Sequence, residues 1–305
     1  MAGSASKLVV SYSEVFGFYL PLWIAQDGGI FKKNGLDVDL QFIASTTSVP
    51  ALVSGQTQIT GVGGSGIMSA VVSGADLQVV TELGPTFPYL FMAPASIKTP
   101  RDLKGQKVGV SQFGSASDIA TRVALQKMGL NPDKDVTIIQ VGTAQNRAAA
   151  LQGGAIQGAV SQPPESVGLE RQGAHTLFDL AAQHLPAANG SFGVQRAWAA
   201  AHRDLVQKFV DSLVQGTARM KRDKAYSISE LKKYYKSDDD AAMQATYDFY
   251  APKVIPALPF PKPEQYTNAK EQLAAKNDKV ASFDVSKILD PSFVQSAADR
   301  GLDHG

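Results

Sequence analysis

Short apolar runs alternate with amphipathic segments along the first 180 residues. Residues 107–111 form one such run, and the segment at 115–128 has apolar residues at helical spacing behind a serine and an aspartate that suit a helix start. This alternation predicts strands and helices in turn. The expected strands are 7–11, 36–43, 58–62, 77–83, 107–111, 135–141, 156–161 and 175–180, and the expected helices are 20–33, 45–54, 67–72, 115–128, 144–152 and 163–172.

After residue 198 the pattern becomes helical only. The proline-rich stretch 254–261 reads as an extended strap within this region. We expect these helices to return to the first part of the chain. They are predicted at 204–222, 229–236, 239–250, 264–276 and 286–298.

The strand–helix series occurs twice. The pattern Ala-Leu-x-x-Gly-x-x-Gln at residues 51–58 recurs at residues 150–157, and the Val-Ser pair at residues 10–11 recurs at residues 110–111. The repeat predicts two related α/β lobes, each a mostly parallel sheet flanked by helices. In such sheets ligands bind beyond the carboxyl ends of the strands, so we expect a cleft between the lobes.

The boundaries of the lobes follow from two segments whose residues favour turns over regular structure. Prolines cluster from residue 85 to residue 100, and a small polar stretch lies at 187–192. We therefore expect crossings near 84–95 and 187–193. Lobe 2 is then 95–187, and lobe 1 is the larger, discontinuous unit 7–86 plus 193–305.

Composition excludes several classes of protein. The chain has 305 residues, and 44% of them are hydrophobic, which is enough for two ordinary cores. A net charge of +1 offers no field for nucleic acid or an anionic membrane, and no apolar run approaches the roughly 20 residues of a membrane span, so we expect a soluble protein. Cysteine is absent, which excludes disulfides and thiolate chemistry. The start, MAGSASK, lacks the regions of a signal peptide, so we expect a mature form whose targeting segment is gone.

Four stretches resemble one known family. They are LPLWIAQDGGIFKKNGLDVDL, VPALVSGQTQI, IKTPRDLKGQKVGVSQFGSASD and MGLNPDKDV. These are similar to the periplasmic solute-binding proteins of the nitrate/sulfonate/taurine type, a family related to the thiamine-pyrimidine synthases. The resemblance covers about residues 8 to 195. It implies a type II periplasmic binding protein fold that closes on a small molecule, a periplasmic location, and delivery to the permease of an ABC importer. We also expect a monomer.

The candidate ligand-binding residues lie in the loops that follow the strands. Helix N-termini with hydroxyl groups favour an anionic headgroup such as a sulfonate or carboxylate, and loop aromatics suit an apolar or aromatic body. The candidates are Ser11, Tyr12, Phe16, Phe18, Tyr19, Thr46, Thr47, Gly64, Ser65, Phe113, Gly114, Ser115, Arg147 and Gln162.

Several of these residues also have a purely structural interpretation. Ser65 and Ser115 suit helix caps, and Gly64 and Gly114 suit special backbone angles. Arg147 could pair with an anion or make a surface contact to an acid such as Asp118 or Glu165. The acids Glu14 and Glu165 could bind an amine or remain solvated.

Two other classes of function compete with binding. A thiamine-pyrimidine-synthase-like enzyme needs the family's cysteine-rich motif, which this chain lacks, and none of the histidines (His175, His184, His202 and His304) lies in a candidate loop. An effector-sensing domain of the LysR type would begin with a helix-turn-helix, whereas here a strand begins at once. We therefore predict a binding protein without catalysis, cofactor or metal. A thiamine-precursor pyrimidine stays open as an alternative to the anion.

Overall fold

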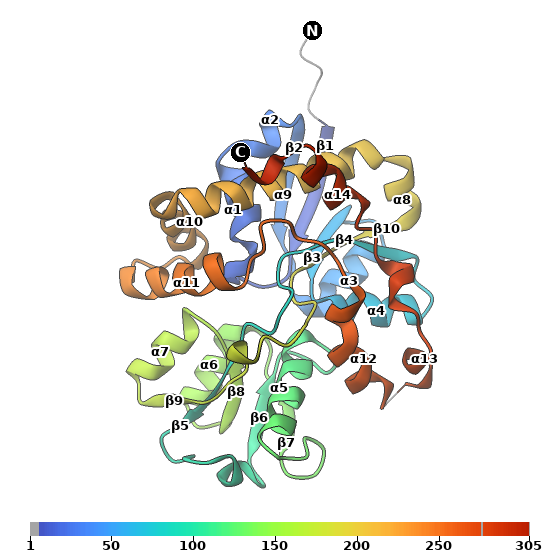
Figure 1. Cartoon of the computed structure of the whole chain (residues 1–305). Coiled ribbons are helices and arrows are strands. Elements are labelled where there is room, and N and C mark those ends of the chain that lie inside the picture. The colour runs from blue at the N-terminus through green and yellow to red at the C-terminus, as the bar shows by residue number, and fades with distance from the viewer. Residues whose placement is uncertain (1–5, 276, 305) are drawn as a thin grey trace.

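The computed structural model describes residues 6–275 and 277–304, which form two lobes, each built on a five-stranded sheet flanked by helices (Figure 1). The sheet of lobe 1 contains β1 (Ser6–Tyr12), β2 (Leu36–Phe42), β3 (Ile59–Val62), β4 (Leu77–Glu82) and β10 (Ser191–Gln195). The sheet of lobe 2 contains β5 (Leu90–Pro94), β6 (Lys107–Val110), β7 (Thr137–Gln140), β8 (Gly158–Ser161) and β9 (Ala174–Asp179). The predicted two-lobed α/β fold is confirmed.

The two sheets have the same arrangement. The strand orders are β2-β1-β3-β10-β4 and β7-β6-β8-β5-β9. In each sheet the first three strands are parallel, and the fourth runs antiparallel to both of its neighbours. That fourth strand follows a crossing from the other lobe. The structural repeat therefore follows the sequence repeat strand for strand.

Helices occupy most of the expected segments. The 20-residue helix α9 (Arg203–Arg222) packs along α1 and buries a stripe that includes Phe209, Leu213 and Met220. The α-helices are α1 (Leu20–Asp27), α2 (Ile30–Lys33), α3 (Ser45–Val53), α4 (Gly64–Val72), α5 (Ala116–Lys127), α6 (Ala144–Gln152), α7 (Glu165–Arg171), α8 (Arg196–Ala201), α9, α10 (Lys224–Tyr235), α11 (Asp240–Lys253), α12 (Thr267–Ala274), α13 (Asp278–Ala281) and α14 (Ser292–Asp299). The 3-10 turns are η1 (Gly17–Tyr19), η2 (Pro100–Leu103), η3 (Ala181–Gln183), η4 (Pro263–Tyr266), η5 (Val285–Ile288) and η6 (Leu302–His304).

The structure corrects several expectations about these elements. The helix expected at 286–298 divides into η5 and α14, which are separated by residues 289–291. The helix expected at 20–33 breaks into α1 and α2, because Gly29 adopts a left-handed φ of 71°. Strand β5 lies inside the proline-rich segment that was interpreted as a crossing only. Strand β10 lies at the predicted second crossing, and its Gly193 permits a close approach to Ile67.

Helix α12 is a further correction, because it does not pack only on lobe 1. It lies against α5 of lobe 2, and Gln272 donates a hydrogen bond to Gln126 at 2.8 Å. Tyr266 and Ala269 belong to the same apolar cluster as Ile119 of α5. An apolar seam therefore joins the lobes on the side of α4, α5 and α12 (Figure 1).

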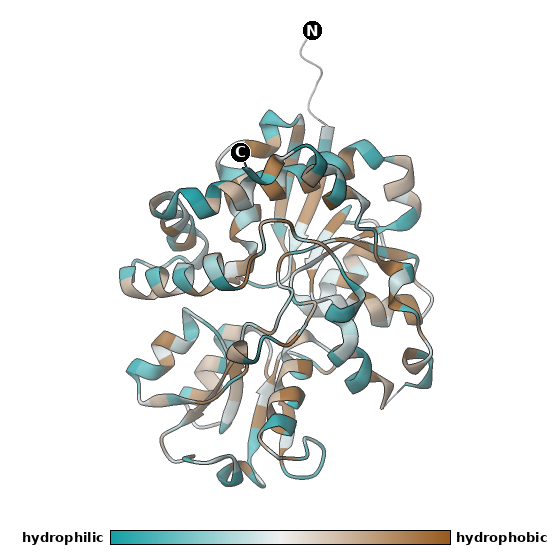
Figure 2. Ribbon diagram, viewed as in Figure 1, coloured by the Kyte–Doolittle hydropathy of each residue, from teal (hydrophilic) through white to brown (hydrophobic). Residues whose placement is uncertain are grey.

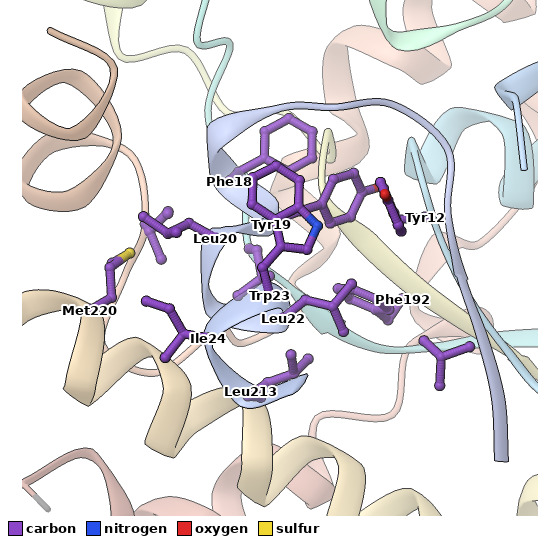
Figure 3. Close-up of a cluster of buried hydrophobic side chains, with 14 of the residues drawn as sticks. Tyr12, Phe18, Tyr19, Leu20, Leu22, Trp23, Ile24, Phe192, Leu213 and Met220 are labelled. Atoms are coloured by element: carbon purple, nitrogen blue, oxygen red, sulfur yellow. The ribbon is translucent and has the colours of Figure 1, made fainter. Parts of the chain in front are cut away.

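The core of lobe 1 is rich in aromatic residues. Trp23 is fully buried and stacks on Tyr234 with ring centroids 4.5 Å apart. Figure 3 shows Trp23 beside Tyr19 and Phe18, with the aliphatic side chains of α1 around them. Figure 2 shows apolar residues along the strands and polar residues on the outer turns of α10 and α11. None of the helices in the described ranges has the length and apolar character that a membrane crossing requires.

Candidate functional site

A pocket of about 230 Å³ lies between the two lobes, at the carboxyl ends of β1, β3 and β6. Helices α3, α4 and α5 begin at this pocket. The residues that line it are Ser13, Glu14, Phe16, Phe18, Ser45, Thr46, Val49, Pro50, Val62, Gly63, Ser65, Gly66, Ser69, Tyr89, Ser111, Gln112, Phe113, Gly114, Ser115, Ala116, Ser117 and Asn189. The cleft expected from the strand pattern therefore exists, and both lobes contribute to it.

The helix N-termini differ in how they are capped. Ser115 caps α5 and accepts a hydrogen bond from the backbone N–H of Asp118 at 3.4 Å, as predicted. The Asp118 carboxylate accepts from the N–H of Gly114 rather than from that of Ser115, so the capping box is shifted by one residue. The caps of α3 and α4 are Ala44 and Gly63, which make no side-chain cap. No cap side chain accepts from their first N–H groups, and the N–H of Gly64 at the start of α4 donates instead to the carbonyl oxygen of Ala188 at 2.8 Å.

Hydroxyl groups dominate the polar lining. Ser65 donates a hydrogen bond to the carbonyl oxygen of Gly114 at 3.0 Å and so joins α4 of lobe 1 to the turn before α5 in lobe 2. Gly114 has a φ of 79°, which a glycine adopts without strain. Ser117 accepts from the N–H of Ser111 at 2.9 Å. The two lobes are therefore in direct contact across the pocket.

Half of the fourteen candidates line this pocket. They are Phe16, Phe18, Thr46, Ser65, Phe113, Gly114 and Ser115. Phe16 and Phe18 meet edge to face with ring centroids 5.4 Å apart, and Phe113 is 54% exposed at the mouth. These residues supply the expected apolar side of the pocket.

The other seven candidates lie outside the lining. Ser11 is buried and donates to Thr60, Tyr12 and Tyr19 pack in the aromatic core (Figure 3), and Thr47 bonds back to Ala44 on α3. Gly64 opens α4, where a Cβ atom would lie 2.6 Å from the hydroxyl of Tyr266. Arg147 and Gln162 are buried behind the lining.

Arg147 corrects the expectation of a surface contact. It is only 1% exposed, and its Nη1 donates to Ser111 Oγ at 2.6 Å and to the carbonyl of Gly142 at 3.0 Å. Asp118 pairs instead with Arg122 at 3.0 Å.

Asn189, Tyr89 and Glu14 line the pocket but were not among the fourteen candidates. Tyr89 and Asn189 lie on the two crossings, which a search of strand-following loops omits. Their proximity to the predicted crossings was the available signal. Burial raises the pKa of Glu14 to about 7, although the Arg147 guanidinium and a backbone hydrogen bond from Ala144 act against this shift.

The crossings meet behind the pocket at one buried carboxyl group. Glu82 Oε1 accepts hydrogen bonds from the N–H groups of Gly84 at 2.8 Å and Gly190 at 2.7 Å, and Oε2 accepts from Ser191 Oγ at 2.5 Å. Burial raises the pKa of Glu82 to about 8 in spite of these donors. A Cβ atom on Gly190 would lie 2.9 Å from the backbone nitrogen of Gly84, so the two crossings touch through their backbones.

An ion pair joins the lobes on the opposite side from α12. Arg171 of α7 pairs with Asp239, the N-cap of α11, through both guanidinium Nη atoms. Both side chains are at least one-third exposed. This side therefore has an exposed ion pair, and Ala144 of α6 and Val167 of α7 also pack against the apolar core of lobe 1 there.

Two matching lobes with a pocket between them define the periplasmic binding protein fold. A family model described as NMT1/THI5 like matches residues 18–225, so the chain belongs to the NMT1/THI5-like family. This confirms the resemblance found in the sequence. YtlA of Bacillus subtilis (strain 168) is 21% identical over 245 residues, which are 76% of this chain and 72% of that protein.

Several solved structures share this fold. The periplasmic aliphatic sulphonate binding protein SsuA of Escherichia coli superposes with a TM-score of 0.76 at 20% identity, over 95% of this chain and 99% of that chain. The alkanesulfonate-binding protein SsuA of Xanthomonas axonopodis pv. citri, bound to MOPS, gives 0.75 at 21% identity, over 96% and 97%. A cysteine-to-serine variant of DszB, in complex with biphenyl-2-sulfinic acid, gives 0.68 at 15% identity, over 97% and 99%.

Proposed function

We propose that this protein is an extracytoplasmic solute-binding protein, which captures a small organic anion and delivers it to the permease of an ABC importer. The observation that carries the proposal is the pocket between the lobes, where serine hydroxyls and the N-termini of three helices converge. Among the described residues, its lining includes no lysine or arginine. Such a site stabilises a monoanion through hydrogen bonds and helix dipoles.

The anion we favour is a sulfonate or a carboxylate with a short apolar or aromatic body. Phe16, Phe18, Tyr89 and Phe113 supply an apolar wall beside the hydroxyl groups. The SsuA proteins are described as binding sulfonates, which supports this choice, and the description of the Escherichia coli protein supports a periplasmic location. The ligand-binding residues we propose are those on the pocket lining.

Capture would proceed by closure of the lobes about the two crossings. Contacts such as that from Ser65 to Gly114 exist only while the lobes are together, so a ligand that touches both lobes shifts the population toward the closed form. We expect small-angle scattering to show a smaller radius of gyration with a bound ligand than without one. Identical profiles would contradict the hinge mechanism.

We also propose that the protein binds its solute without transforming it. The chain has no cysteine, and none of its histidines is among the described pocket-lining residues. The fold is shared with the desulfurization enzyme DszB, so fold alone does not decide this point. Prolonged incubation with the bound solute should leave its mass unchanged.

A second candidate ligand is a thiamine-precursor pyrimidine. Glu14 favours this alternative because it lines the pocket near aromatic residues, and a carboxylate can accept hydrogen bonds from ring or amino N–H groups.

A thermal-unfolding screen tests the proposal and separates the two ligand classes. The panel contains alkanesulfonates, taurine, nitrate, aliphatic and aromatic carboxylates, and pyrimidines. A ligand at about a hundredfold its dissociation constant stabilises the folded protein by about 2.7 kcal/mol, which gives a visible shift. The substitution Ser45→Ala should weaken the binding of an anion about tenfold. Ser282→Ala, at an exposed position outside the lining, should leave the affinity unchanged. A panel without any hit would contradict the proposed ligand chemistry.

A further inference from the structure

A cluster of charged and polar side chains is buried between the lobes, beside the pocket and toward α7 and α11. Glu14 comes from the loop after β1 in lobe 1, and it is 8% exposed. Arg147 of α6, Gln162 after β8 and Glu165 of α7 come from lobe 2. Arg147 and Gln162 are 1% and 0% exposed. Glu165 is half-buried. The cluster therefore combines groups from both lobes at their interface.

The cluster is short of partners. In the described part of the chain, Glu14 Oε2, Glu165 Oε2, Arg147 Nε and Nη2, and both polar side-chain atoms of Gln162 are buried without a hydrogen bond. The partners that are present involve other atoms, such as Gln145, which donates to Glu165 Oε1 at 3.0 Å. Buried polar groups in folded proteins are normally satisfied, so this concentration at one interface requires an explanation.

The charges do not balance either. The cluster contains two carboxyl groups and one guanidinium, so it carries one net negative charge when both acids are ionised. A buried charge without a partner is costly, and a protonated carboxyl group removes the charge and gains an O–H donor. The other titratable groups that face the pair are tyrosines, namely Tyr19 of η1, Tyr89 of the first crossing, Tyr235 of α10 and Tyr250 of α11. Burial raises the pKa of all four tyrosines, so they stay neutral and do not change the net charge of the cluster.

We propose that closure of the lobes takes up a proton on the Glu14–Glu165 pair, so that ligand capture by this protein is coupled to pH. This regulation rests on the proposed function, because it acts through the closure that traps the solute. Protonation neutralises the cluster in the closed form, whereas separated lobes leave both carboxyl groups in water.

The direction of the coupling follows from the two environments. Burial raises the pKa of both Glu14 and Glu165 to about 7 in the closed form, and Arg147 opposes the shift in each. Water restores ordinary values when the lobes separate. The closed form is therefore favoured at acidic pH, and the advantage is lost as the pH rises through about 7.

The test measures affinity and compactness as a function of pH. The probe is butane-1-sulfonate, which stays ionised throughout, in amine buffers that carry no sulfonate group. For one carboxyl group shifted this far, the affinity should be about twentyfold weaker at pH 7.5 than at pH 5.5. The ligand-free protein should also scatter as a more compact particle at pH 5.5.

Variants separate protonation from a merely structural role. Glu165→Gln removes the acid that lies outside the pocket lining and leaves Glu14 balanced by Arg147, so at pH 7.5 this variant should bind as tightly as the unmodified protein does at pH 5.5. Its affinity and compactness should not change with pH. Glu170→Gln, at an exposed position on the same helix, should keep the full pH dependence.

The outcomes distinguish the two proposals. If butane-1-sulfonate does not bind but the ligand-free protein compacts at acidic pH in a manner that depends on Glu14 and Glu165, the sulfonate chemistry is wrong and the proton coupling stands. If the sulfonate binds with the same affinity at both values of pH, or if Glu165→Gln keeps the pH dependence, the coupling is overturned. If neither affinity nor compactness changes with pH, it is overturned as well.

Discussion

Replacing Glu82 by alanine and by glutamine should have very different effects on stability. Alanine leaves the N–H groups of Gly84 and Gly190 and the hydroxyl of Ser191 without their acceptor. Each buried donor left unsatisfied costs about 1–3 kcal/mol, so we expect a loss of about 3–5 kcal/mol. Glutamine retains an oxygen for the two N–H groups and offers its amide N–H to Ser191. We expect it to cost less than about 1 kcal/mol.

The pH dependence of stability, compared between the unmodified protein and Glu82→Gln, tests whether this carboxyl group is protonated in the folded protein. The pKa of Glu82 is raised to about 8 in the folded protein, so its contribution to stability is complete below its ordinary value and is lost as the pH rises through about 8. From pH 7 to pH 9 the free energy of unfolding should fall by about 1.4 kcal/mol through this group. Glu82→Gln should not show this decrease. The other buried acids are common to both proteins, so they cancel in the comparison.

Urea unfolding followed by circular dichroism at pH 7 and pH 9 measures both effects. The reasoning would be refuted if glutamine destabilised the protein as much as alanine, because Glu82 would then act as an ionised acceptor at neutral pH. It would also be refuted if Glu82→Gln lost as much stability as the unmodified protein between the two values of pH.

Five further substitutions, two of them controls, test other parts of the fold by the same unfolding assay. Gly190→Ala should cost about 2 kcal/mol or more because its Cβ meets the other crossing, whereas Gly168→Ala in α7, with open space around it, should be neutral or stabilise by up to about 1 kcal/mol. Arg122→Met should lower the free energy of unfolding by about 3–5 kcal/mol, because it leaves the buried Asp118 carboxylate without its ion-pair partner. Lys104→Ala, which removes an exposed ion pair, should lower it by less than about 1 kcal/mol. Phe209→Ala in the core of α9 should cost about 3–5 kcal/mol, and a loss below about 1 kcal/mol would contradict the packing described.

The repeating strand–helix pattern was enough to predict two matching lobes. Periodicity located 107–110 and 144–152 within a residue or two, because strand and helix burial leave direct traces in the order of apolar residues. Strands β5 and β10 were missed because each lies beside a crossing. Prolines around β5 and glycines around β10 indicate turns locally, and only pairing with distant strands makes these segments regular.

The site was predictable to the level of loops rather than side chains. Sequence position shows that 111–117 follows a strand, but not which of its side chains turn inward. Tyr12 and Tyr19 satisfy the same loop rule as Phe16, yet they pack around Trp23, because the aromatic core is completed by α10 from more than two hundred residues later. The burial of Arg147 was not predictable from its place in the sequence, because its hydrogen-bond partner Ser111 lies on a different loop, 36 residues earlier.

The unequal sides of the interface determine where an engineered sensor should be placed. Apolar packing of α5 against α12 should keep that side together, so we expect the gap to open on the side of α7 and α11, where the exposed pair between Arg171 and Asp239 lies. Because the chain contains no cysteine, two introduced cysteines would be the only attachment points for a pair of fluorophores. A donor on α7 and an acceptor on α11 should report each capture event, and the same dyes on α5 and α12 should give almost no signal.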